Sequence, residues 1–224
     1  MPKKITIITL VNDVAMYNQA VLFSLRGQGV NFDFLPILHA KSASIGLNEG
    51  IAASPNDIVV CCHQDVLFPN DWASVVFNAV ATASPWPMGV LGTFGRGLNL
   101  NTVGAIWNPR PKHMHAGVLP TEALTLDEHC LIFRKSSGLR FNGTLPGWHV
   151  YGADICLTAR DMGLRNWVFD SCGLEHLSAK GSGEGLGTAI EWLYREWKDR
   201  TDLKTFRTMC FELDFQTGIR VQYL

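Results

Sequence analysis

The chain has neither an excess of one charge nor a long apolar run, and these two absences exclude whole classes of function. Its 19 basic residues are balanced by 20 acidic residues, which gives a formal net charge of -1. Nucleic-acid-binding domains need a basic surface that contacts phosphates, so we expect no nucleic-acid partner. No apolar stretch approaches the roughly 18 residues that a membrane-spanning helix needs, so we expect no transmembrane segment.

The six cysteines form no C-x-x-C pair, and most of them lie in apolar runs such as IVVCCH and HCLIF. Buried thiols explain this placement better than zinc ligands or a disulfide framework, and reduced cysteines are typical of the cytosol. The N-terminal run MPKKITIITLV starts with basic residues, but its apolar part stops at Asn12 and is too short for an export signal. The sequence therefore predicts a cytoplasmic protein, either free or held peripherally at the inner face of the membrane.

Apolar residues are abundant, at 47% of the chain against 17% charged residues, which is enough for a large core. A length of 224 residues suits one substantial domain, and the sequence has no internal repeat and no long linker. We expect one domain over residues 1–180. Residues 181–224 are expected to form a glycine-rich loop and a C-terminal helical extension that packs on the same domain.

Strands and helices alternate in the first half of the sequence. Ile5–Val11 and 57–62 are short apolar runs, as in strands that are buried on both faces, and Phe32–Leu38 is expected to be a further strand between them. Helical spacing of apolar residues over 12–26 and 44–53, and again after the third strand, places a helix after each strand. This order predicts an α/β fold with a mostly parallel central sheet and helices on both faces.

The second half is less regular. Its expected strands are 88–94, 103–107, 126–134 and 166–169, and its expected helices are 153–162 and 188–200. The last helix carries Trp192 and Trp197, and its role stays open between packing on the core, forming a homodimer, and touching a membrane or partner surface.

A polar triplet, His63-Gln64-Asp65, directly follows the third expected strand. Ligands of open α/β sheets bind outside the carboxyl ends of the strands, and an unpaired buried aspartate is costly, so the triplet is a candidate binding site. The alternative is that Asp65 caps a turn and His63 is a hydrogen-bonded boundary residue.

Two further segments carry candidate chemistry. Asp154 lies at the start of the helix ADICLTARDMG, where it is either a general base or an N-cap aspartate. His176 follows the strand NWVFDSCGL and can complete a metal site with a distant carboxylate, although a lone histidine is more often structural. His113 and His115, in a proline-rich loop, are interpreted as surface residues with weak metal potential.

Taken in order, these segments resemble a known family. The stretch SIGLNEGIAASPNDIVVCCHQDVLFPNDW resembles the nucleotide-binding half of GT-A glycosyltransferases in the large inverting group that includes cellulose and chitin synthases, and in particular a small bacterial branch with H-Q-D-V at a strand end. FNGTLPGWHVYGADICLTARDMG resembles the acceptor-side motif of that group, and NWVFDSCGLEHLS resembles the strand that ends in a metal-binding histidine. The resemblance covers about residues 4–180. It departs from the family at His63 and Ala153, each of which replaces an acidic residue.

The resemblance implies a single GT-A domain that transfers a hexose-type sugar from a nucleoside diphosphate, most simply a UDP-sugar, with inversion. The acceptor would be a hydroxyl of a glycan, a lipid-linked molecule or a small molecule. A divalent cation, Mn²⁺ or Mg²⁺, would offset charge on the leaving diphosphate. Asp65 and His176 would be its ligands, with His63 as a further candidate, and a histidine ligand favours Mn²⁺.

Further roles follow from the same resemblance. Asp154 would be the general base, and Asp127 and Glu128 are second candidates for the base or for acceptor contacts. Trp148 and His149 are expected on the acceptor side, where Trp148 either stacks on a sugar or belongs to the core. The residues expected to bind the donor are Val11, Asn12, Asp33, Asn48, His63, Gln64 and Asp65, although Asn48 suits a local hydrogen bond equally well. Residues 180–187 have the composition of a lid, or of a loop without function.

Two other readings remain. A degenerate GT-A domain would bind a sugar nucleotide or glycan without turnover, a reading motivated by His63 and Ala153. A nucleotidyltransferase would need a glycine-rich phosphate loop after the first strand, and the sequence there is NDVAMYN, without glycine.

Overall fold

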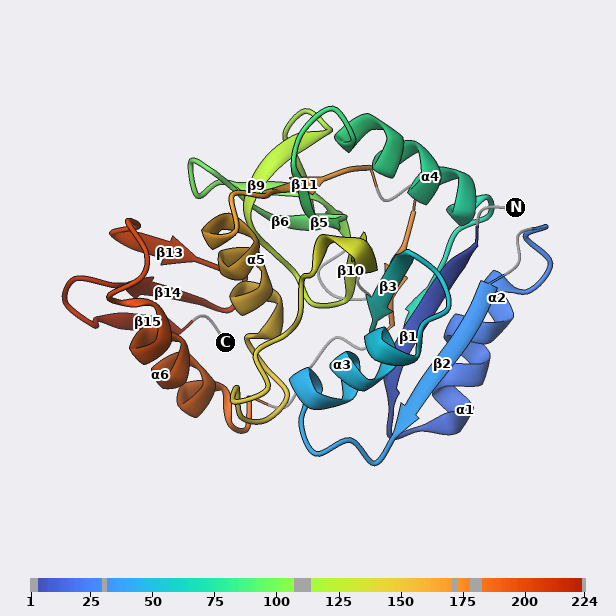
Figure 1. Ribbon diagram of the computed structural model, residues 1–224, viewed down its shortest axis with the longest axis horizontal. Helices are drawn as coiled ribbons and strands as arrows, with labels where there is room; N and C mark the ends of the chain where they lie inside the picture. The colour runs from blue at the N-terminus through green and yellow to red at the C-terminus, as the bar shows by residue number, and fades with distance from the viewer. Residues whose placement is uncertain (1–3, 30–31, 107–113, 171–172, 178–182, 223–224) are drawn as a thin grey trace.

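The computed structural model describes residues 4–29, 32–106, 114–170, 173–177 and 183–222. A ten-stranded sheet crosses the molecule in the order β2-β1-β3-β10-β5-β11-β9-β6-β7-β8 (Figure 1). Its strands are β1 (Ile5–Val11), β2 (Phe32–Leu38), β3 (Ile58–Cys62), β5 (Met88–Gly92), β6 (Phe94–Gly97), β7 (Thr102–Ile106), β8 (Met114–Ala116), β9 (Thr121–Leu126), β10 (Cys130–Arg134) and β11 (Arg165–Val168).

Most strands of this sheet run in one direction, although many neighbours are antiparallel. β2, β1 and β3 are mutually parallel, and β11 is parallel to β5. β10 runs against both β3 and β5, and β9 and β7 run against their own neighbours. With β10, β9 and β7 reversed, the remaining seven of the ten strands share one direction. The carboxyl ends of β1 and β3 therefore lie at the same edge of the sheet, where the polar triplet follows β3.

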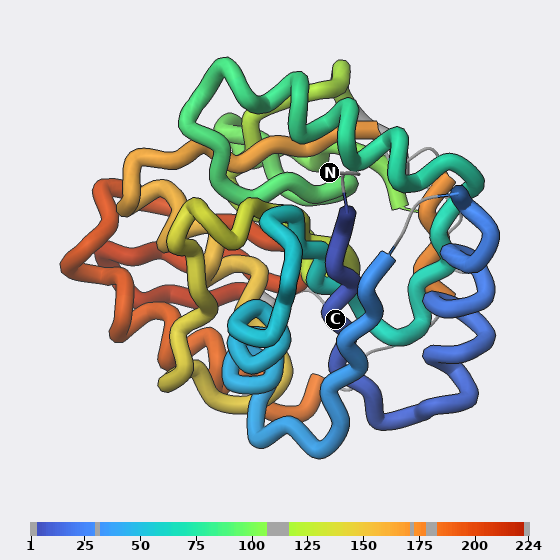
Figure 2. Tube along the Cα trace, turned by 45° about the vertical axis from the view of Figure 1, so that its right-hand side comes forward, coloured from blue at the N-terminus to red at the C-terminus, as the bar shows by residue number. Residues whose placement is uncertain are grey.

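Helices cover both faces of the sheet (Figure 2). The helices of one face are α3 (Ala43–Ala53), α5 (Tyr151–Asp161) and α6 (Leu186–Trp197), which share one apolar core. Those of the other face are α1 (Val14–Tyr17), the π-helical turn η1 (Asn18–Leu22), α2 (Phe23–Leu25) and α4 (Trp72–Ala83), which share a second core. Side chains of the central strands alternate between the two cores, so Ile8 packs in the first and Ile7 in the second. The α/β class expected from the sequence is confirmed.

Two small sheets complete the described structure. β4 (Val66–Leu67) pairs with β12 (Glu175–His176), with His176 opposite Val66. The C-terminal part forms a three-stranded antiparallel sheet of β13 (Thr205–Arg207), β14 (Phe211–Asp214) and β15 (Arg220–Gln222). The expected helical extension thus contains α6 and, in addition, these three strands, because alternating apolar residues in β14 bury Phe211 and Leu213 as a half-buried strand does.

One expected strand is also wrong. Residues 126–134 form the end of β9, a turn, and β10, instead of one continuous strand. The turn forms because the Asp127 carboxylate accepts a hydrogen bond from the backbone N–H of His129 at 3.1 Å, an interaction that competes with strand pairing. Asp127 and Glu128 therefore project from a turn at the edge of the sheet.

Trp197 is buried and Trp192 is partly buried against the core, so the C-terminal helix packs on the domain, which was one of its three open roles. Among the helices that the structure describes, none combines the length and the apolar character needed to cross a bilayer.

Candidate functional site

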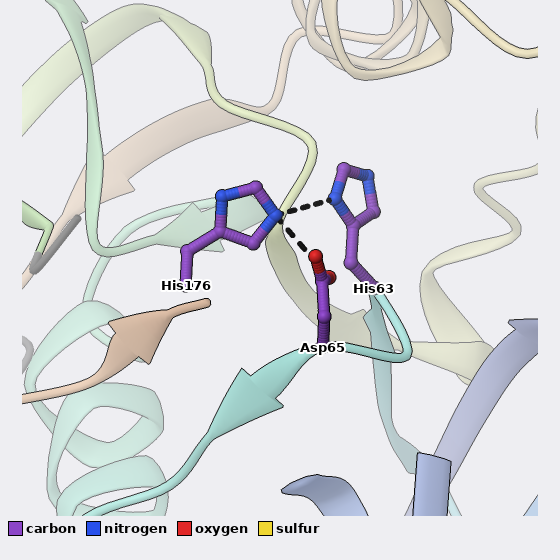
Figure 3. Close-up of side chains that lie close together, drawn as sticks. All are labelled: His63, Asp65 and His176. Atoms are coloured by element: carbon purple, nitrogen blue, oxygen red, sulfur yellow. Dashed lines mark hydrogen bonds and ion pairs between the residues drawn. The ribbon is translucent and has the colours of Figure 1, made fainter. Parts of the chain in front are cut away.

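Three potential metal ligands meet at the carboxyl end of β3. Figure 3 shows the side chains of His63, Asp65 and His176 directed toward one another. Each offers a ligand atom within 4.8 Å of the others. His176 Nε2 lies 3.3 Å from Asp65 Oδ1 and 3.1 Å from His63 Nδ1. The antiparallel pair β4–β12 holds this arrangement, because the backbone N–H of Leu177 donates to the Asp65 carbonyl at 2.9 Å.

The two imidazoles of the cluster have pKa values that are shifted in opposite directions. Burial, followed by the neighbouring His176, lowers the pKa of His63 to about 4, so its imidazole is neutral at pH 7. Burial alone would lower the pKa of His176, but the hydrogen bond and charge of Asp65 outweigh it and raise that pKa. Neutral imidazole nitrogens and one carboxylate are ligands for Mn²⁺, Zn²⁺ or Fe²⁺, so the donor set fits a divalent cation without selecting one.

Tyr151, at the start of α5, orients His63. Its hydroxyl lies 2.8 Å from His63 Nε2, while His63 Nδ1 faces His176. Partners of this kind commonly fix the orientation of a ligating histidine. Sequence reasoning did not single out Tyr151, because the contact joins residues 88 positions apart.

Gln64, the middle residue of the triplet, is bound to the β1–α1 junction. Its Oε1 accepts from the backbone N–H groups of Asn12 and Asp13 at 3.0 and 2.9 Å. Its Nε2 donates to Asn12 Oδ1. Asn12 is exposed at this edge, whereas the Val11 side chain is buried in the core and offers a ligand only its backbone.

Asp127 belongs to a hydrogen-bonded chain that runs into the interior. Its Oδ1 lies 2.7 Å from His129 Nδ1, and His129 Nε2 lies 2.7 Å from the hydroxyl of Thr93. Burial would raise the pKa of Asp127, but the hydrogen bond and charge of His129 hold it well below its usual range. Thr93 and His129 are both 0% exposed, so this Asp-His-Thr chain cannot present a nucleophile to a substrate. It keeps Asp127 ionised and oriented.

Glu128 lies at the N-terminus of α5. Its Oε1 accepts from the backbone N–H of Gly152 at 2.9 Å, which is favourable at the positive end of a helix. Burial nevertheless raises the pKa of Glu128 to about 8, with opposition from Gly152 and a further increase from Asp127. As a whole residue Glu128 is half-buried, whereas Asp154 is fully buried.

Asp154 is placed differently from the expectation for a base. It is 0% exposed, with Oδ1 accepting from Trp197 Nε1 at 2.9 Å and Oδ2 accepting from the backbone N–H of Asn142 at 3.4 Å. Burial raises its pKa to about 6, although the Trp197 hydrogen bond opposes the shift. A base must come within hydrogen-bond reach of the proton it removes, and Asp154 is enclosed between α5, α6 and the preceding loop.

Two expected donor-binding residues lie elsewhere. Asp33 lies near the amino end of β2, opposite Thr6, and its Oδ2 accepts from Asn56 Nδ2 at 2.7 Å. Asn48, on α3, donates to the Phe141 carbonyl at 2.7 Å and accepts from the Phe141 N–H at 3.0 Å. The structure therefore assigns both side chains to hydrogen bonds within the fold and does not bring Asp33 to the triad.

The acceptor-side loop is at the surface. Trp148 is 50% exposed, which excludes the core interpretation. His149 Nε2 lies 3.1 Å from the Glu184 carbonyl, so this loop contacts the segment before α6. His113 lies outside the described residues, as do positions 180–182 of the expected lid, and the side chain of His115 is likewise not described.

Comparison with known proteins gives a fold and leaves the family open. No family model matches the chain. ATP synthase subunits region ORF 6 of Fuscovulum blasticum is 32% identical over 154 residues, which make up 62% of this chain and 60% of that protein. The chain thus spans about three fifths of the length of the curated relative that it matches.

The similar solved structures are glycosyltransferases of GT-A-like fold. S. aureus TarS 1-349 in complex with UDP-GlcNAc has a TM-score of 0.57 at 11% identity, over 90% of this chain and 68% of that one. The mannosyltransferase PcManGT from Pyrobaculum calidifontis in complex with GDP-Man and Mn²⁺ has a TM-score of 0.51 at 13% identity, over 88% of this chain and 61% of that one. At such identities the likeness establishes the fold alone, and this chain has the fold of these glycosyltransferases.

Proposed function

We propose that the protein transfers a sugar from a nucleoside diphosphate to an acceptor hydroxyl. The observation that carries this proposal is the convergence of His63, Asp65 and His176 at the carboxyl end of β3, where ligands of open α/β sheets bind. The similar structures contain UDP-GlcNAc or GDP-Man, so the donor we propose is a sugar linked to UDP or GDP.

Asp65, His176 and His63 would hold the divalent cation, for which we propose Mn²⁺ or Mg²⁺. When bound, such a cation neutralises charge on the diphosphate as the bond to the sugar breaks. Asp65 supplies the only anionic group of the three, and Tyr151 keeps the His63 imidazole turned toward the site. Two imidazoles in the ligand set favour Mn²⁺ over Mg²⁺.

Glu128 is the general base that the geometry supports best. It is partly exposed, its carboxylate is fixed by the Gly152 N–H, and its pKa of about 8 lies near neutrality. Asp154 is enclosed, and the depressed pKa of Asp127 makes that residue a weak proton acceptor. Removal of the acceptor proton by Glu128 would accompany a single displacement at the anomeric carbon, with inversion of configuration. Asp127 would accept hydrogen bonds from sugar hydroxyls.

The second candidate is a domain of the same fold that binds a sugar nucleotide without turnover. The enclosure of Asp154 favours this reading, because the residue in the acceptor-side motif is then unable to act as a base. The two candidates differ in catalysis and agree in nucleotide binding.

Calorimetric titration with UDP and with GDP, each with and without Mn²⁺, tests the proposal. We expect metal-dependent binding of at least one nucleotide, weakened by about tenfold or more in Asp65→Ala and in His176→Ala. Asp33→Ala is a matched control, because it removes a carboxylate from the opposite end of the same sheet region. If neither nucleotide bound in any metal condition, both candidates would be wrong. Binding without transfer or donor hydrolysis across a donor-sugar screen would favour the second candidate.

A further inference from the structure

A cavity of about 510 Å³ lies between α4 and the sheet, on the face opposite α3, α5 and α6. Ala79 and Ala83 line it from α4, where a spacing of four residues puts both side chains on the same side of the helix. Trp167 of β11 and Phe169, which follows that strand, line it from the sheet. The cavity therefore exists because small residues of the helix leave space beside large aromatic residues of the sheet.

Most of the cavity lining is apolar or aromatic. Trp86 packs on Trp167 with ring centroids 5.0 Å apart and is itself 40% exposed. Leu91 of β5 and Leu119, in the segment before β9, add aliphatic surface. Binding sites for small molecules have this character, with a volume of roughly 300–1,000 Å³ and a mainly apolar lining that carries a few polar groups.

The few polar residues of the lining limit the charge of a ligand. They are Asn78 and Thr82 on α4 and Asp170 after β11. Among the described residues that line the cavity, none is basic, and Asp170 is the only charged one. A phosphate or a fatty-acid carboxylate would therefore meet no cation here and would be repelled by Asp170. An uncharged ligand with hydroxyl groups is favoured, because the three polar side chains are hydrogen-bonding partners for hydroxyls.

The Asp170 end of the cavity lies at the edge of the sheet that carries the triad. β3 and β5 both run antiparallel to β10, and β11 runs parallel to β5, so these three strands end at one edge. Asp170 follows the end of β11, just as the triplet with His63 and Asp65 follows the end of β3. Trp86 precedes β5 and lies toward the opposite edge. A ligand along the cavity would thus have one end on the side of the proposed reaction.

We propose that this cavity binds the aliphatic chain of an uncharged amphiphile, whose hydroxyl-bearing head lies at the Asp170 end, and that this amphiphile is the acceptor. The assignment to the acceptor rests on the proposed function, whereas the binding of an uncharged chain rests on the cavity alone. The acceptor is then a neutral lipid-like molecule, such as a glycolipid, and neither a free sugar nor an anionic lipid.

Binding is tested by calorimetric titration of the whole chain with decyl maltoside, octyl maltoside and maltose, each detergent kept below its critical micelle concentration. We expect saturable binding of decyl maltoside and none of maltose. Octyl maltoside should bind about tenfold more weakly, because two fewer methylene groups are buried. Decanoate has a similar chain with a negative head and should bind about tenfold or more weakly than decyl maltoside.

Two leucine substitutions on α4 form a matched pair. Ala79→Leu fills the cavity with a good helix former, so we expect a native or higher melting temperature and a loss of about tenfold or more in decyl maltoside affinity. Ala81→Leu makes the same change at an exposed position that is not among the described lining residues, and affinity should stay within about twofold. Neither substitution should alter UDP binding, because the donor is proposed to lie at the triad.

The assignment to the acceptor is tested by transfer from the sugar nucleotide that the wild type binds. We expect kcat/KM to be about tenfold or more higher for decyl maltoside than for maltose in wild type and in Ala81→Leu. This preference should be lost in Ala79→Leu, because the filled cavity no longer holds the chain.

Four results would count against the proposal. Absence of saturable decyl maltoside binding, or equal affinity in Ala79→Leu and wild type, would show that the cavity is not the binding site. Sedimentation with phosphatidylcholine vesicles without binding of monomeric decyl maltoside would identify a membrane-docking face instead. Tighter binding of decanoate than of decyl maltoside would exclude an uncharged ligand. Binding without preferential transfer to decyl maltoside would overturn the assignment to the acceptor.

Failure of the proposed function gives a different result. The wild type would then bind decyl maltoside, with the loss in Ala79→Leu, but would bind neither UDP nor GDP in any metal condition.

Discussion

Polar side chains cluster at both ends of β3, and the two clusters differ in how their hydrogen-bonding groups are paired. At the amino end, the Thr6 hydroxyl accepts from Ser54 Oγ at 2.7 Å and from Asn56 Nδ2 at 2.9 Å, and Asp33 accepts from the same Asn56. At the carboxyl end, the imidazoles of His63 and His176 face each other and the carboxylate of Asp65. The amino end is a complementary set of donors and acceptors, whereas the triad at the carboxyl end consists of three side chains that can each act as a metal ligand.

This difference shows which clusters of polar side chains at strand ends indicate a binding site. Hydroxyls and amides at the amino end pair with one another, and their burial needs no external partner. At the carboxyl end, His176 faces both the Asp65 carboxylate and a second imidazole, and all three side chains have atoms that can bind a divalent cation. The kind of groups gathered at a strand end, and not polarity as such, therefore marks a candidate ligand-binding end.

The largest effect expected from this comparison is on catalysis at the carboxyl end. Asp65→Asn removes the only anionic metal ligand at nearly constant shape, and we expect transfer activity to fall by about 1,000-fold, the scale of losing a main electrostatic contribution. Asp33→Asn makes the same change at the amino end and should leave kcat and KM within about twofold. Steady-state assays of both variants check this. Equal losses in the two variants would contradict the contrast between the ends.

The next largest expected effect distinguishes Glu128 from Asp154 as the general base. Glu128→Gln keeps an acceptor for the Gly152 N–H but cannot take up a proton, so we expect kcat to fall by about 100-fold or more. Asp154→Asn should retain most activity, because Asp154 is enclosed. Since the pKa of Glu128 is about 8, wild-type kcat/KM should rise with pH and level off above that value. A large loss in Asp154→Asn with little change in Glu128→Gln would reverse the assignment.

A third effect concerns stability and its dependence on pH. Burial raises the pKa of Asp154 in the folded protein to about 6, above the unfolded value of 3.8. The raised pKa therefore adds on the order of 3 kcal/mol to the free energy of unfolding while Asp154 is protonated. This contribution is complete below about pH 4 and is lost as pH rises through 6. Denaturant unfolding at pH 5 and pH 8 should show a smaller decrease for Asp154→Asn than for wild type. A parallel decrease in both proteins would show that another group titrates.

The smallest expected effect is that of a substitution at the amino end of β3. Thr6→Val removes the shared acceptor of Ser54 and Asn56 in a residue that is 0% exposed, and we expect a loss of about 2 kcal/mol in the free energy of unfolding. Nucleotide binding should not change, because the other end of the strand carries the triad. Thermal unfolding and a UDP titration on the same sample check both statements. Altered nucleotide affinity in a folded Thr6→Val protein would show that the two ends are coupled.

The sequence predicted the first half of the fold closely because β1 and β3 are continuous, fully apolar runs and β2 is a short, mostly apolar segment between two helical patterns. β1 and β2 have the expected limits, Ile5–Val11 and Phe32–Leu38. The break between β9 and β10 was missed because LDEHCLIF contains no glycine, proline or asparagine, and the turn depends on the Asp127 side chain. β13 to β15 were missed because strands of three or four residues show too little alternation to detect.

The metal triad could be predicted from the sequence because each of its residues lies at or just after the end of a strand. His63 and Asp65 follow β3, and His176 lies on a second strand end, so the structure brings together the three expected ligands. The roles of Tyr151 and His129 depend on contacts between distant residues, which no local pattern reveals. Burial of Asp154 depends on Trp197, 43 residues further along, and was equally hidden.

The contact between Trp197 and Asp154 also bears on how the chain folds. α6 contributes Ile190 and Leu193 to the core that contains α5, and its indole is the donor for a carboxylate that has no access to water. A fragment that stops at residue 180 would expose that apolar surface and leave Asp154 without this donor. The C-terminal segment therefore belongs to the same cooperative unit as the strands that carry the triad, and we expect the whole chain to unfold in one transition.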